Sequence, residues 1–173
     1  MKHLWTAGFA LIIALVAPAC SDNSNDPSPT GPPKYQAAML QSNEVPAIDN
    51  ADRTGSGIAN VTLNVTRDAS NNITAATADF TVTLQNFPAN SSLTGAHIHG
   101  GKAGASGGIL VSAGLASGEI VLSSTGSDGF TKTGHNETAE VAQNILNDPS
   151  AFYFNVHTTL SPGGAIRGQL VAQ

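Results

Sequence analysis

The sequence is poor in the residues on which several protein classes depend. Its 173 residues include one cysteine, one tryptophan, 5% aromatic and 11% charged residues. A single cysteine excludes an internal disulfide framework and a cysteine-rich zinc site. Seven Lys and Arg stand against twelve Asp and Glu, for a formal net charge of −5. This balance argues against a surface that binds nucleic acid.

Glycine is abundant instead, and the apolar residues alternate with polar ones. Residues 57–66 place Val61, Leu63 and Val65 on one face and polar residues on the other, the pattern of a half-buried strand. After a polar turn, residues 73–84 repeat this alternation, so the two segments predict a β-hairpin. The other predicted strands are 35–41, 93–99, 108–111, 119–123, 151–158 and 166–172.

One segment has helical spacing. Residues 137–147 place Val141, Ile145 and Leu146 at intervals that form one face of a helix, and Asn136 is a suitable N-cap. The sequence therefore predicts an all-β fold, an antiparallel β-sandwich or barrel of about eight strands with one short helix.

The N-terminal segment has the layout of an export signal. Lys2 and His3 precede an uncharged apolar run, and small residues then lead to Cys20. This resembles a bacterial lipoprotein signal, with 1–19 removed and the Cys20 thiol lipidated. The match departs from the usual pattern at Ala17, where leucine is usual, and an ordinary secretory signal is the alternative. By resemblance to the lipoprotein sorting rule, Ser21 favours the outer membrane.

A polar segment follows the expected lipidation site. Residues 20–33 contain four prolines and no large apolar side chain, a composition that predicts a disordered, flexible tether. We expect the folded domain to span 34–173 and the lipid bilayer to be a partner through acylated Cys20.

Three histidines carry the strongest candidate chemistry. His97 and His99 are two residues apart and share one face of a predicted strand. His157 occupies the polar face of another strand, opposite Phe154 and Val156. If the two strands are neighbours, the three imidazoles converge into an open site for zinc or copper. The alternative is that they are hydrogen-bonding partners of backbone groups.

Three further polar residues suggest structural roles. Arg167 lies on the last predicted strand, and Glu44 is a candidate for an ion pair with it. Asn155 shares the polar face of His157. By contrast, His135 is expected in a solvent-facing loop before the helix.

Several of these segments together resemble the CHRD domain family, over about residues 35–173. The motifs lie at 40–46 (LQSNEVP), 96–100 (AHIHG), the glycine-rich loop to Gly108, 154–158 (FNVHT) and 162–169 (PGGAIRGQ). The resemblance implies a single all-β domain and a shared role for His97, His99 and His157. The family has no settled biochemical function, and it usually has glutamate where this chain has Ala165.

These observations leave three alternative hypotheses about function. The first is an envelope-anchored, non-catalytic binding or structural module with an unknown envelope or extracellular ligand. The second is a copper- or zinc-binding envelope protein that uses the three histidines. The third, a metal-dependent enzyme, also needs a general base and a substrate cleft. The sequence has no nucleophile elbow, paired carboxylates or dinucleotide fingerprint, so we expect no enzymatic activity.

Overall fold

The computed structural model describes residues 31–173. The expected signal peptide, Cys20 and most of the tether lie outside the described residues. The strands are β1 (Lys34–Leu40), β2 (Ser56–Arg67), β3 (Ile73–Gln85), β4 (Leu93–Gly100), β5 (Ile109–Ser112), β6 (Asp128–Glu137), β7 (Phe152–Thr158), β8 (Ile166–Gln169) and β9 (Val171–Ala172). The helices are α1 (Ala139–Asn147) and the 3-10 turns η1 (Gln41–Asn43), η2 (Ala51–Thr54) and η3 (Pro149–Ala151).

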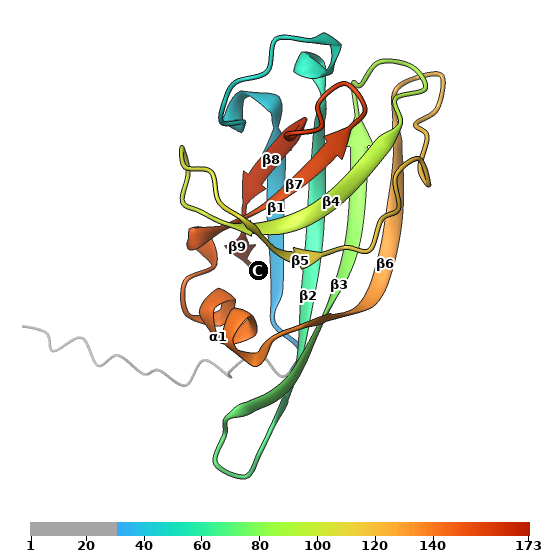
Figure 1. Cartoon of the computed structure of the whole chain (residues 1–173). Helices are drawn as coiled ribbons and strands as arrows, with labels where there is room; N and C mark the ends of the chain where they lie inside the picture. Colours follow the sequence, from blue (N-terminus) through green and yellow to red (C-terminus); the bar gives the residue numbers. More distant parts are fainter. Residues whose placement is uncertain (1–30) are drawn as a thin grey trace, which may run out of the picture.

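All strand pairs are antiparallel, and the sheet runs in the order β5-β4-β7-β8-β1-β2-β3-β6, with β9 paired to β1. Strands β4, β7 and β8 cross in front of β1, β2 and β3 (Figure 1), so the sheet folds over on itself into a nearly closed barrel. This confirms the predicted all-β class. No helix within residues 31–173 is long and apolar enough to span a membrane.

The core lies between the two layers and follows the predicted alternation. Val61 and Leu63 of β2 are buried, as are Phe80 and Val82 of β3. Phe80 packs against Phe154 of β7, with ring centroids 5.6 Å apart. Side chains alternate between the two faces of a strand. The apolar residues of β4, β7 and β8 face the core, so the polar residues between them face the outside of the front layer.

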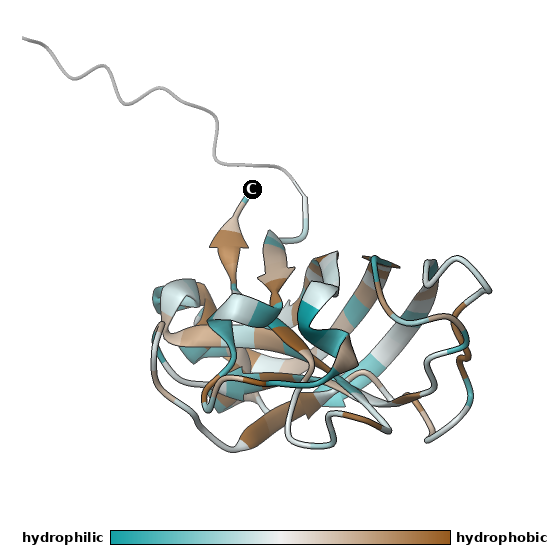
Figure 2. Ribbon diagram, turned by 90° about the horizontal axis from the view of Figure 1, so that it is seen from above, coloured by the Kyte–Doolittle hydropathy of each residue, from teal (hydrophilic) through white to brown (hydrophobic). Residues whose placement is uncertain are grey.

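The two ends of the domain lie on one side. The Gln173 backbone N–H donates to the Lys34 carbonyl at 3.0 Å, and Tyr35 pairs with Ala172. Figure 2 shows the C-terminus beside the point where the chain enters the fold.

Four local predictions were wrong. Residues 119–123 form only an isolated bridge, between Val121 and Ser92, and 166–172 is divided into β8 and β9. The helix begins at Ala139, and Thr138 is its N-cap in place of Asn136, accepting from the Val141 N–H. Strand β6 occupies 128–137, where no strand was predicted. It places His135 half-buried against Phe80, with ring centroids 6.1 Å apart, and not in a solvent-facing loop.

Candidate metal centre

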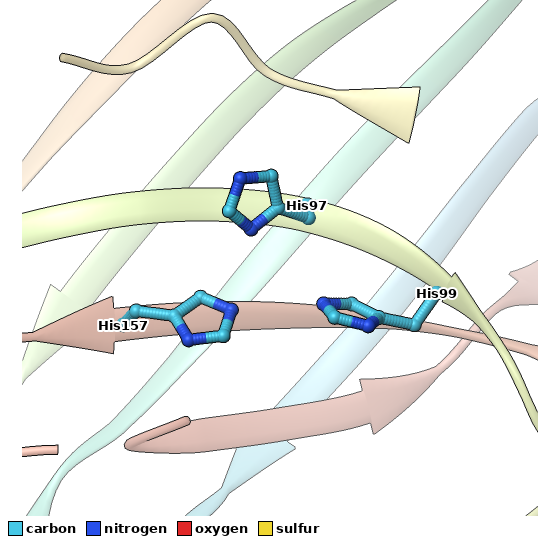
Figure 3. A group of neighbouring side chains, drawn as sticks. All are labelled: His97, His99 and His157. Carbon is cyan, nitrogen blue, oxygen red and sulfur yellow. The ribbon is translucent and has the colours of Figure 1, made fainter. Parts of the chain in front are cut away.

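Strand register brings the three predicted histidines together. On β4 and β7, His97 pairs with Asn155, His99 with Tyr153, and Gly95 with His157. The three imidazoles therefore stand on the outer face of two adjacent strands, and Figure 3 shows them pointing toward one another. One ligand atom from each lies within 4.8 Å of the others.

Gly95 makes room for this convergence. A Cβ atom at this position would lie 2.7 Å from Cε1 of His97, because the His97 ring leans back over the glycine. Any larger residue at position 95 would therefore displace the His97 ring. The centroids of these two rings are 5.0 Å apart.

Loop carbonyls fix two of the rings. Nδ1 of His99 is 3.0 Å from the Gly107 carbonyl oxygen, and Nδ1 of His157 is 3.0 Å from that of Pro162. A carbonyl oxygen only accepts hydrogen bonds, so each Nδ1 carries the proton and each Nε2 keeps its lone pair. Metal-binding histidines are commonly oriented by this kind of contact.

One nitrogen of each imidazole has no hydrogen-bond partner within residues 31–173 and is available to bind a metal. Nε2 of His99, Nε2 of His157 and Nδ1 of His97 are buried and have no hydrogen-bond partner among the described residues. Three nitrogens at the usual zinc distance of about 2.0–2.1 Å lie roughly 3.3 Å apart. The ligand atoms lie within 4.8 Å of one another, so the rings must move closer together for one ion to reach all three.

The surroundings keep these imidazoles neutral. Burial lowers the pKa of His97 to about 4, helped by the neighbouring His157 and His99. Burial also lowers the pKa of His99, assisted by the positive charge of Arg167. The pKa of His157 is lowered as well, chiefly by burial. Neutral imidazole is the form that binds a metal.

Tyr153 supports His99 from behind. Its ring stacks on the His99 ring at a centroid distance of 5.0 Å and an interplanar angle of 8°. Its hydroxyl accepts from the Gly107 N–H at 3.2 Å. Gly107 therefore contacts both Tyr153 and His99. The loop after β4 therefore holds His99 directly and through Tyr153.

Arg167, Glu44 and Asn155 form a buried polar group beside the histidines. Arg167 is 2% exposed, and its Cζ atom lies 4.5 Å from the Tyr153 ring centroid. The direct ion pair expected with Glu44 is not formed: the side-chain salt bridge among residues 31–173 joins Lys132 and Glu119. Burial raises the pKa of Glu44 to about 7, opposed by the charge of Arg167 and by the amide of Asn155.

Comparison with known families identifies the domain but assigns no role to these residues. The family model for the CHRD domain matches residues 35–170. The chain belongs to the CHRD domain family. Comparisons of this CHRD domain with curated proteins and with solved structures found no match.

Sequence reasoning missed the groups that orient the histidines. The carbonyls of Gly107 and Pro162 carry no side-chain signal, and their positions depend on how two loops fold over the sheet. Position 165 offers no carboxylate because the residue is alanine, and Ala165 is fully buried.

Proposed function

We propose that this CHRD domain is a non-catalytic binding module that holds one zinc or copper ion through His97, His99 and His157. The observation that carries the proposal is the set of three converging, partnerless nitrogens, two of them on rings oriented by carbonyls. Buried polar nitrogens without partners are costly, and a bound ion would satisfy all three at once.

The donor set favours these metals. Three imidazoles without a carboxylate suit zinc and copper better than magnesium or calcium, which prefer oxygen ligands. Three protein ligands leave a fourth coordination position. His97 is the least buried of the three, so we place that position on its side of the cluster. A partner or a solvent molecule would occupy it.

We further propose that the module is exported and held at the cell envelope. The support is the sequence of 1–33, where the lipoprotein-like signal ends at Cys20 and a polar segment precedes the domain. A binding domain on a lipid anchor would meet its ion and its partner outside the cytoplasm.

Metal content tests the binding proposal. The chain from Ser21 onward, without a histidine tag, would be loaded with zinc or copper, dialysed and analysed by mass spectrometry. We expect about one ion per chain. His97→Ala and His157→Ala should each weaken metal binding at least about tenfold, because each removes one of the three ligands.

His135→Ala is the matched control, since His135 lies on β6 outside the cluster. It should bind as the unaltered protein does. Circular dichroism would establish that each variant keeps its β structure. Absence of an ion in the unaltered protein, or equal loss in all three variants, would refute the metal site and leave a binding module without metal.

A further inference from the structure

Arg167 is a buried charge without a fixed counter-charge. Its Nε donates to the Asn43 carbonyl and its Nη1 donates to the Ala105 carbonyl at 3.0 Å, so both partners are neutral. Nη2 has no partner within the described residues. Across residues 31–173, no carboxylate oxygen lies within 4.0 Å of the guanidinium. Buried charges are ordinarily paired because desolvation is expensive.

A cleft leads to this guanidinium. It has a volume of about 260 Å³ and lies between the segment 42–45 and the loop after β4. Its lining includes Arg167, Gln169 and Glu44, and the lining residues Val45, Ala103 and Gly104 are exposed. Oε1 of Glu44 is also buried without a hydrogen-bond partner among the described residues. Arg167 and Glu44 therefore bring one unused donor with positive charge and one unused acceptor to the lining of the cleft, and both atoms are shielded from solvent.

We propose that this cleft binds a small carboxylate that carries a hydroxyl or amino group on the neighbouring carbon. The ligand's carboxylate accepts from Nη2 of Arg167, and its hydroxyl or amino group donates to Oε1 of Glu44. The inference is independent of the metal proposal, because it uses none of the three histidines.

The charges of the lining residues favour a small carboxylate over other anions. One guanidinium matches the single charge of a carboxylate and forms strong hydrogen bonds with it. Above its pKa of about 7, Glu44 is ionised and repels a second negative charge, which disfavours sulfate and phosphate. The volume suits a molecule of a few heavy atoms, since one water occupies about 30 Å³ in the liquid.

The test uses lactate as the probe and the chain from Ser21 onward, which retains every described element, in buffer with a chelator. NMR would follow the backbone amides of 42–45 and 103–105. We expect saturable shifts there, with dissociation in the millimolar range that is typical of so small a ligand. Acetate, which lacks the hydroxyl, should bind more weakly. Lactamide, which lacks the charge, should bind at least about tenfold more weakly.

A variant that fills the cleft keeps the test independent of Arg167, whose replacement could unfold the domain. Ala103→Phe places a large side chain in the mouth and should weaken lactate binding at least about tenfold. Ala116→Phe, at another exposed loop alanine, should bind lactate normally.

Three results would overturn the inference: no saturable shifts with lactate, equal binding of lactate and lactamide, or unchanged binding by Ala103→Phe. Because the buffer contains no free metal, none of these results bears on the histidine site. Conversely, loss of metal binding in His157→Ala leaves the carboxylate proposal intact.

Discussion

At the scale of single residues, Glu137 shows how burial sets the behaviour of a carboxyl group. Both of its oxygens are buried and lack hydrogen-bond partners among the described residues. Burial alone raises its pKa to about 7 from 4.5. The folded protein thus holds this proton through a pH range in which the unfolded chain releases it.

Glu137 should therefore make the protein less stable as pH rises. Its favourable contribution is complete below about pH 4.5 and is lost as pH passes through about 7. Glu137→Gln removes this ionisation. Relative to the unaltered protein, the variant should gain roughly 1–2 kcal/mol between about pH 5 and pH 8, a value reduced from the full linkage because the side chain is only partly shielded.

Urea unfolding of both proteins at the two pH values measures this gain. Glu140→Gln is the matched control, because Glu140 is exposed on α1, and it should change stability equally at both values. A Glu137→Gln variant whose effect is the same at both pH values would contradict the argument.

The histidine cluster shows how far residue types and their spacing can predict a site. Alternation along a strand assigns a face to His97 and His99, and the apolar residues beside His157 assign its face as well. Neither pattern reveals that the two strands are neighbours, because pairing joins segments far apart in the chain. The partners at Gly107 and Pro162 are backbone atoms of irregular loops, so no residue type marks them.

At the scale of elements, Asp52 ties η2 to the end of β7. It is fully buried, and its Oδ2 accepts from the hydroxyls of Thr158 and Ser161, the latter at 2.8 Å. Asn50 adds a hydrogen bond from its side-chain amide to the Leu160 carbonyl at 3.0 Å. These contacts hold the turn that carries Pro162, whose carbonyl orients His157.

Asp52→Ala should loosen this turn. It leaves two hydroxyl groups without their acceptor in a buried setting, and we expect a loss of about 2–3 kcal/mol in the free energy of unfolding. Metal affinity should also fall, by about tenfold, because His157 loses part of its support. Denaturant titration and metal titration measure the two effects.

Asp49→Ala, at an exposed position nearby, is the control and should leave both quantities close to those of the unaltered protein. Unchanged stability in Asp52→Ala would mean that the buried network contributes no net stabilisation. Lower stability with full metal affinity would separate the turn from the histidine site.

Strand β6 is the element that the sequence pattern did not predict. Its ten residues contain one large apolar side chain, Phe130, so alternation gives little signal. Its position comes from pairing with β3, whose outer edge it covers, with a register shift between Ala78 and Phe80. Gly134 adopts a φ of +72° near this shift, a conformation that glycine accepts readily. Pairing between distant segments, not local propensity, decides such a strand.

At the scale of the whole molecule, the chain enters the domain beside its C-terminus, because Lys34 and Gln173 are hydrogen bonded. The 13 residues between Cys20 and Lys34 are those numbered 21–33. An anchor at Cys20 would thus attach to one side of the barrel and leave the histidine face of β4 and β7 free for ligands.

Replacing Cys20 should abolish membrane attachment. If Cys20 is lipidated as we propose, its acyl chains give stable anchoring, and a chain without them loses it. In a Gram-negative host, the unaltered protein should partition into the detergent phase and carry radiolabelled fatty acid. Cys20→Ser should partition into the aqueous phase without label.

Ser21 tests the destination separately from the anchor. Ser21→Asp should remain lipidated but move from the outer to the inner membrane fraction, since the sorting rule reads the residue after the cysteine. Ser21→Ala is the control and should stay in the outer membrane. An aqueous unaltered protein would refute the anchor itself. A lipidated protein whose location is unchanged by Ser21→Asp would keep the anchor and refute the outer-membrane assignment. Neither result would bear on the proposed metal and carboxylate sites, because their residues lie within the barrel domain.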